Sequence, residues 1–191
     1  MHFFTADDYR SIDNDGKRFA AQLAAYKRHL EGLRGLLPDE VLALAVLPGV
    51  DDGLLIEVHH DRALRTLQLI LRCGDLQMGY YDLRLDYEEI DLPSQTAWTL
   101  ARIARTTTSD GRHQHDVAYH EIDRSEDGGI DHRLLFHPGV VVTLRCRSLH
   151  WRTIAQPDRN FPALPDRFPG GPAWAAYHAR RRRLRAEPPR R

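Results

Sequence analysis

The first clear hydrophobic pattern along the chain is a stripe with helical spacing. Six apolar residues follow one another at intervals of three and four: Phe19, Leu23, Tyr26, Leu30, Leu33 and Leu37. This spacing places them on one face of an α-helix, with charged residues on the other faces. Because Pro38 follows the stripe, a helix is predicted over residues 17–37. Such a helix more often lies across a sheet than in a coiled-coil seam.

A second pattern alternates apolar and polar residues and is typical of strands. Within residues 78–91, the side chains of Tyr81, Leu83, Leu85 and Tyr87 share one face, and those of Asp82, Arg84, Asp86 and Glu88 share the other. One packed face and one wet face indicate an antiparallel sheet. Residues 54–59 and 64–73 are predicted to form two strands before it.

The second half of the chain repeats this order. Ser94 is a suitable N-cap for a helix over residues 94–105, whose predicted apolar side is formed by Ala97, Trp98, Ala101 and Ala104. Three strands are then predicted over residues 115–123, 131–137 and 140–154. The last of these should bend near Ser148, because its apolar positions change parity there.

Together these elements predict an α+β fold. We expect a mainly antiparallel sheet of about six strands with both helices on one face. The order of one helix and three strands, found twice, is compatible with an internal duplication. A single domain is predicted over residues 1–155. Residues 156–191 are expected to form a Pro-rich arm, a short amphipathic helix and an Arg-rich tail.

The net charge of zero hides an uneven distribution along the chain. Residues 179–191 contain seven arginines and one glutamate, whereas residues 1–178 contain 20 basic and 26 acidic residues. The run formed by Arg180, Arg181, Arg182, Arg183 and Arg185 is a candidate site for nucleic acid, because arginines bind phosphate backbones. A solvated tail, or docking of the tail onto an acidic protein surface, are the alternatives.

The composition also sets expectations for location. The N-terminal residues lack the basic and apolar segments of an export signal. The longest apolar run, residues 41–47, is far shorter than the roughly 20 residues that span a bilayer. Cys73 and Cys146 lie among apolar residues and are expected to be buried thiols rather than a disulfide. A cytoplasmic protein without a cofactor and without membrane contact is therefore predicted.

The polar face of the closing strands is the preferred candidate for a functional surface. If the two closing strands lie side by side, the acidic residues of the first meet the basic residues of the second. The candidate residues for binding a protein partner are Asp82, Arg84, Asp86, Arg145 and Arg147. The corresponding hypothesis is a non-catalytic protein-binding module with no catalytic residue.

A histidine cluster supplies the alternative hypothesis of a metal-dependent hydrolase. His113 and His115 share a face of an extended segment, and His120 follows within the strand predicted over residues 115–123. Imidazole nitrogens are common zinc ligands, and three ligands are the minimum for a catalytic site. No established metal-binding spacing is present, so solvated histidines are the competing interpretation.

Several short motifs resemble those of a known group of proteins. They are the opening Met1-His2-Phe3-Phe4-Thr5, the run Tyr119-His120-Glu121-Ile122, and the segment of residues 131–135. Over residues 1–155 the chain resembles a bacterial family of uncharacterised cytosolic proteins that begin Met-x-Tyr/Phe-Phe-Thr. This resemblance implies an α+β protein with no catalytic residue to carry over. The layout of helices and strands also resembles, more loosely, that of immunity proteins that neutralise bacterial toxins.

Overall fold

A computed structural model describes residues 2–5, 16–75, 79–110 and 115–156 of the chain. These residues form three helices, α2 (Gly16–Gly32), α3 (Asp39–Leu44) and α4 (Ser94–Asp110). The strands among them are β1 (Leu54–Asp61), β2 (Thr66–Asp75), β3 (Gly79–Glu88), β4 (Val117–Arg124), β5 (Ile130–Phe136), β6 (Val140–Cys146) and β7 (Ser148–Ala155). The predicted α+β class is confirmed.

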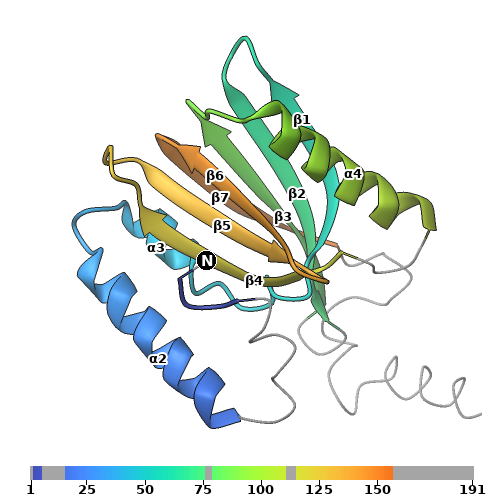
Figure 1. The fold of residues 1–191 in the computed structure, drawn as a ribbon. Helices are drawn as coiled ribbons and strands as arrows, with labels where there is room; N and C mark the ends of the chain where they lie inside the picture. The colour runs from blue at the N-terminus through green and yellow to red at the C-terminus, as the bar shows by residue number, and fades with distance from the viewer. Residues whose placement is uncertain (1, 6–15, 76–78, 111–114, 157–191) are drawn as a thin grey trace, which may run out of the picture.

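The strands form two antiparallel sheets, shown in Figure 1. The first sheet has the order β1-β2-β3-β7, and the second has the order β4-β5-β6. Only Arg147 separates β6 from β7, so the chain passes there from the second sheet into the first. This break confirms the bend predicted near Ser148. The single strand predicted over residues 140–154 is therefore two strands, β6 in the second sheet and β7 in the first.

The core lies between the two sheets. On the first sheet, Leu69 of β2 and Leu85 of β3 are fully buried, and Tyr87 is 1% exposed. On the second sheet, Leu134 and Leu144 are fully buried. All belong to one hydrophobic cluster, so the described residues share a single core. Alternation along β2 and β3 therefore gives one face to this core and the other to solvent.

The expected pairing of the closing strands is confirmed for β7, the C-terminal half of the last predicted strand, but it is wrong for the half that carries Arg145. β3 is bonded to β2 on one side and to β7 on the other, while β6 is bonded to β5. Asp82, Asp86 and Glu88 consequently lie opposite Ile154, His150 and Ser148 in the register, and not opposite Arg145 and Arg147. The bend at Arg147 is the reason, since it moves the arginine-bearing half of the strand into the second sheet.

The first helix ends earlier than predicted. α2 ends at Gly32, and Gly35 adopts a positive φ of 77°, a conformation that glycine tolerates best. Leu33 and Leu37 are still buried, although they lie beyond the helix. The periodic stripe therefore correctly identified buried positions, while the two glycines determined where the helix stops.

The apolar side of α4 matches the predicted one only in part, since Ala104 is buried and Ala97 packs against the core. Leu100 and Ile103 are fully buried, whereas Trp98 is 55% exposed and Ala101 is exposed. The helix packs against β1. The large indole lies outside, where the Arg102 guanidinium stands 5.3 Å from the ring centroid.

Each helix contacts a different strand instead of covering one face together. α4 packs on β1 and α3 on β7. α2 lies beside β4, where the Tyr26 hydroxyl accepts a hydrogen bond of 2.7 Å from the Ile122 main-chain N–H. No helix of the described residues is long and apolar enough to cross a membrane.

Candidate functional site

The outer face of the first sheet carries a dense set of polar side chains. Strand alternation places these residues opposite the buried leucines and tyrosines of β2 and β3. The outer face is defined by Glu57, His59, Gln68, Arg72, Asp82, Arg84, Asp86, His150 and Arg152. Three of the five predicted binding residues, Asp82, Arg84 and Asp86, therefore share one surface.

Charged groups on the outer face are ordered by internal pairs. The Arg72 Nε lies 3.1 Å from Asp82 Oδ1, and the Arg84 Nε lies 2.8 Å from Asp86 Oδ2. The Gln68 amide donates to Asp86 Oδ1 at 2.8 Å. These bonds restrict the rotamers of the central side chains, so the surface presents a fixed pattern of charge.

Arg152 is the exception on the outer face. It lies directly opposite Arg84 in the register of β3 and β7, and its side chain is exposed. Within the part of the chain that the structure describes, no carboxylate pairs with Arg152. Like charges directly opposite one another in a sheet repel. Arg84 is paired with Asp86, whereas no described carboxylate neutralises the positive charge of Arg152.

A groove of about 790 Å³ opens at one end of the outer face. Its lining includes His59, Gln68, Arg84, Asp86 and His150. The groove thus brings imidazole, amide, guanidinium and carboxylate groups to one surface. Such a lining can form hydrogen bonds and ion pairs with a polar partner.

The other two predicted binding residues lie elsewhere. Arg145 is on the second sheet, where its Nε is 2.8 Å from Asp131 Oδ1. Arg147 stands at the bend between β6 and β7, and donates to the Asp127 main-chain oxygen at 2.8 Å. The structure therefore divides the predicted surface in two. Both arginines have about half of their side chains exposed.

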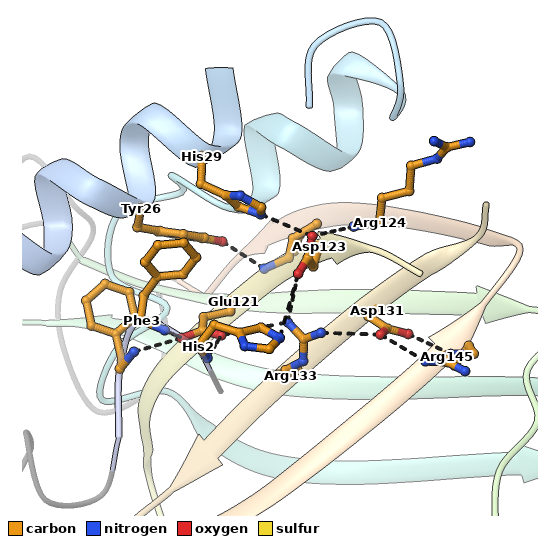
Figure 2. Close-up of polar contacts among 12 residues, drawn as sticks. His2, Phe3, Tyr26, His29, Glu121, Asp123, Arg124, Asp131, Arg133 and Arg145 are labelled. Atoms are coloured by element: carbon orange, nitrogen blue, oxygen red, sulfur yellow. Dashed lines mark hydrogen bonds and ion pairs between the residues drawn. The ribbon is translucent and has the colours of Figure 1, made fainter. Parts of the chain in front are cut away.

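A charged network on the second sheet was not predicted from the sequence and is shown in Figure 2. Arg133 occupies its centre, with guanidinium nitrogens 3.3 Å from both Asp123 Oδ2 and Asp131 Oδ2, and 3.9 Å from Glu121 Oε2. His29 of α2 joins it through Nε2, 3.1 Å from Asp123 Oδ1. The network links α2 to β4 and β5.

Asp123 illustrates how the network holds charge near the interior. Burial acts to raise the pKa of Asp123, but hydrogen bonds from the Arg124 main chain and the Arg133 guanidinium outweigh it. The pKa of Asp123 is therefore lowered, and the carboxylate stays ionised.

Glu121 fixes the N-terminal segment to β4. Its side chain is 1% exposed and accepts main-chain N–H bonds from His2, Phe3 and Phe4 at 2.8, 2.7 and 2.8 Å. Figure 2 shows this carboxylate beside His2 and Phe3. The only signal in the sequence was a glutamate within the predicted strand of residues 115–123. Its partners come from residues almost 120 positions away, so the pattern could not identify them.

The predicted metal ligands do not converge among the described residues. His113 lies outside them. The Nδ1 of His115 is 2.9 Å from the His137 main-chain oxygen, and the Nδ1 of His120 is 3.3 Å from His132 Nε2. The described residues contain no group of three or more His, Cys, Asp or Glu side chains placed to hold a metal ion.

Two further predictions concern the thiols and the tail. Cys73 and Cys146 are buried and are not bonded to one another, and burial raises the pKa of each thiol to about 12. Thiols of this kind are structural rather than nucleophilic. The arginine run of residues 180–185 lies outside the described residues, so its binding of nucleic acid stays a prediction.

Comparison with known proteins adds nothing to this description. No family model, curated protein or solved structure matches the chain. The resemblance based on the opening residues and on the run 119–122 therefore also stays a prediction.

Proposed function

We propose that the protein is a non-catalytic protein-binding module that recognises its partner through the outer face of the first sheet. The supporting observation is Arg152, which pairs with no carboxylate among the described residues and lies opposite Arg84, beside a polar groove. A partner carboxylate placed between the two guanidinium groups would relieve their repulsion and gain two charge-assisted hydrogen bonds. The partner is therefore expected to present an acidic side chain at the contact.

The internal pairs on the outer face favour the same function. Arg72 and Arg84 already have carboxylate partners, so their positions are set before a partner arrives. Preorganised side chains lose less conformational entropy on binding than free ones do. An immunity-type role, in which the partner is a toxin, is one form of this proposal.

The test compares charge reversal on the outer face with a matched reversal elsewhere. Affinity capture from a lysate of the source organism would use the full chain, the Arg84→Glu/Arg152→Glu double variant and the Arg28→Glu variant. Arg28 is an exposed arginine of α2 and serves as the control. We expect one stoichiometric protein to be captured by the full chain and by Arg28→Glu, and lost from the double variant, with all three thermal midpoints similar. Equal capture by the double variant would contradict the proposed surface.

A further inference from the structure

A cavity of about 300 Å³ lies beside β4, away from the outer face of the first sheet. It is enclosed by α2, by the N-terminal segment, by residues 45–51 after α3, and by β4 itself. Four aromatic side chains, Phe4, Phe19, Tyr26 and Tyr119, form part of its lining. The volume is at the lower end of the roughly 300–1,000 Å³ typical of sites for small molecules.

The aromatic rings hold one another in place. Phe4 stacks on Tyr119 with ring centroids 4.8 Å apart, and it meets Tyr26 edge-on at 5.6 Å. Phe19 lies 5.9 Å from Tyr119. Glu121 anchors Phe4 from the main chain, and the bond from the Ile122 N–H anchors Tyr26. The wall is therefore preorganised to contact a flat aromatic ring.

The buried residue His120 also belongs to the lining of the cavity. The residue is 7% exposed, and its Nδ1 lies 3.3 Å from Nε2 of the fully enclosed His132. The Nδ1 of His132 in turn lies 2.8 Å from the Tyr87 hydroxyl. Since Nδ1 of His120 is used in this chain, Nε2 is the ring nitrogen left for a ligand.

Hydrogen-bond donors and acceptors along this chain assign the proton on His120. Among the described residues the Tyr87 hydroxyl has one polar partner, His132 Nδ1, so the hydroxyl donates to that nitrogen. Burial lowers the pKa of both histidines, that of His120 to about 4, and each neutral ring carries a single N–H. His132 therefore donates from Nε2 to His120 Nδ1, and the proton of His120 resides on Nε2.

The main chain of His120 adds to the polar lining of the cavity. The Ile122 N–H points away from β5 because it donates to Tyr26. In an antiparallel strand, residues two positions apart direct their N–H and C=O groups to the same side. The peptide groups of His120 therefore also point to the open edge of β4.

From these contacts we propose that the cavity binds a small, flat aromatic molecule whose carbonyl or carboxylate oxygen accepts a hydrogen bond from Nε2–H of His120. The rings of Phe4, Phe19 and Tyr119 contact the flat body of the ligand. Lys27 and Asp51 also line the cavity, and both are exposed. The positive charge of Lys27 favours a carboxylate on the ligand, whereas the negative charge of Asp51 disfavours one. A ligand with a carboxylate and a ligand with a neutral carbonyl must therefore be compared directly.

The first test uses three probes on the full wild-type chain. The probes are 2-naphthamide, 2-naphthoate and naphthalene, the last being a ring without an oxygen acceptor. We expect 2-naphthamide or 2-naphthoate to shift the amide resonances of Phe19, Tyr119 and His120 in ¹H–¹⁵N NMR spectra, and to bind about tenfold more tightly than naphthalene, the effect of one hydrogen bond. A preference for 2-naphthoate identifies a carboxylate ligand, and a preference for 2-naphthamide a neutral carbonyl. No shift at these residues at millimolar concentration, or equal binding of naphthalene, would overturn the proposal.

The second test examines the histidine chain itself. Long-range ¹H–¹⁵N spectra of the imidazole rings are expected to show the Nε2–H tautomer at His120. The Tyr87→Phe variant removes the donor that fixes this tautomer, so we expect probe binding to weaken several-fold without any change in the cavity wall. The Arg28→Gln variant is the control and should bind as the wild type does. An Nδ1–H tautomer at His120 in the wild type contradicts the proposal even if the variant fails to fold.

Discussion

At the scale of single residues, Glu121 binds the N-terminal segment to β4. It satisfies three main-chain donors of the N-terminal segment, which no regular element would satisfy. It also lies within 3.9 Å of Arg133. A buried carboxylate is stable when hydrogen bonds and an opposite charge both compensate its desolvation, and Glu121 has both.

Replacement of Glu121 by glutamine tests this role. The amide keeps one oxygen acceptor but loses the second oxygen and the charge, so we expect Glu121→Gln to lower the free energy of unfolding by about 1–3 kcal/mol. Urea denaturation measures the loss, and hydrogen exchange at His2, Phe3 and Phe4 should become faster. Glu31→Gln, on an exposed position of α2, is the control and should change neither quantity. Unchanged stability of Glu121→Gln would show that the three bonds contribute little.

At the scale of the elements, packing decided which side of α4 is buried. In α4, both Trp98 and Leu100 are apolar, yet the structure buries the leucine and exposes the tryptophan. α4 packs against β1. The exposed indole of Trp98 instead makes a cation–π contact with the Arg102 guanidinium. The sequence pattern alone was compatible with burial of either side of α4, because alanines occur on both sides.

Truncation of these two residues should separate their contributions. We expect Leu100→Ala to lower the free energy of unfolding by about 2–5 kcal/mol, because it leaves a cavity in the core. Trp98→Ala should cost less than about 1 kcal/mol, since it removes an exposed ring and one cation–π contact. Thermal or urea unfolding of the two variants gives the comparison. A larger loss for Trp98→Ala than for Leu100→Ala would place the buried side of α4 where the sequence analysis expected it.

At the scale of the whole molecule, a hydrogen-bonded chain joins the two sheets through the core. Tyr87 belongs to β3 of the first sheet, and His132 and His120 belong to β5 and β4 of the second. Both imidazoles are kept neutral, because burial lowers their pKa. The cohesion of the two sheets therefore depends on the protonation state of these two histidines.

Acidification should weaken the protein for this reason. In the unfolded chain each histidine binds a proton near pH 6.5, whereas in the folded protein the pKa of His120 is about 4 and that of His132 is also lowered. Stability from the neutral rings is complete above pH 6.5 and is lost as the pH falls towards 4, at about 1.4 kcal/mol per pH unit for each histidine. Urea denaturation at pH 7, 6 and 5 measures this slope.

Two variants attribute the slope to the buried pair. His132→Gln should show a shallower dependence of the unfolding free energy on pH than the wild type does. His59→Gln, at an exposed position of the outer face, should keep the wild-type slope. If the wild-type free energy of unfolding is constant between pH 7 and 5, the histidines do not remain neutral in the folded protein.

Local patterns in the sequence determined much of the fold. Alternation along residues 78–91 identified β3 and the face that carries Asp82, Arg84 and Asp86, because strand geometry alone sends neighbouring side chains to opposite faces. Helical spacing likewise identified buried positions from Tyr26 to Leu37, and the parity change near Ser148 indicated the break between β6 and β7. These features depend on residues that are close in the chain.

Contacts between distant residues were decided only by the tertiary structure. The pairing of β3 with β7, the separation of Arg145 and Arg147 from the outer face, and the Tyr87–His132–His120 chain all join residues far apart in sequence. Strand alternation fixes the face on which a side chain lies, but not which strand becomes its neighbour. The choice of neighbour follows from the burial of the whole core, and that choice placed His120 in the wall of a cavity and Arg152 opposite Arg84.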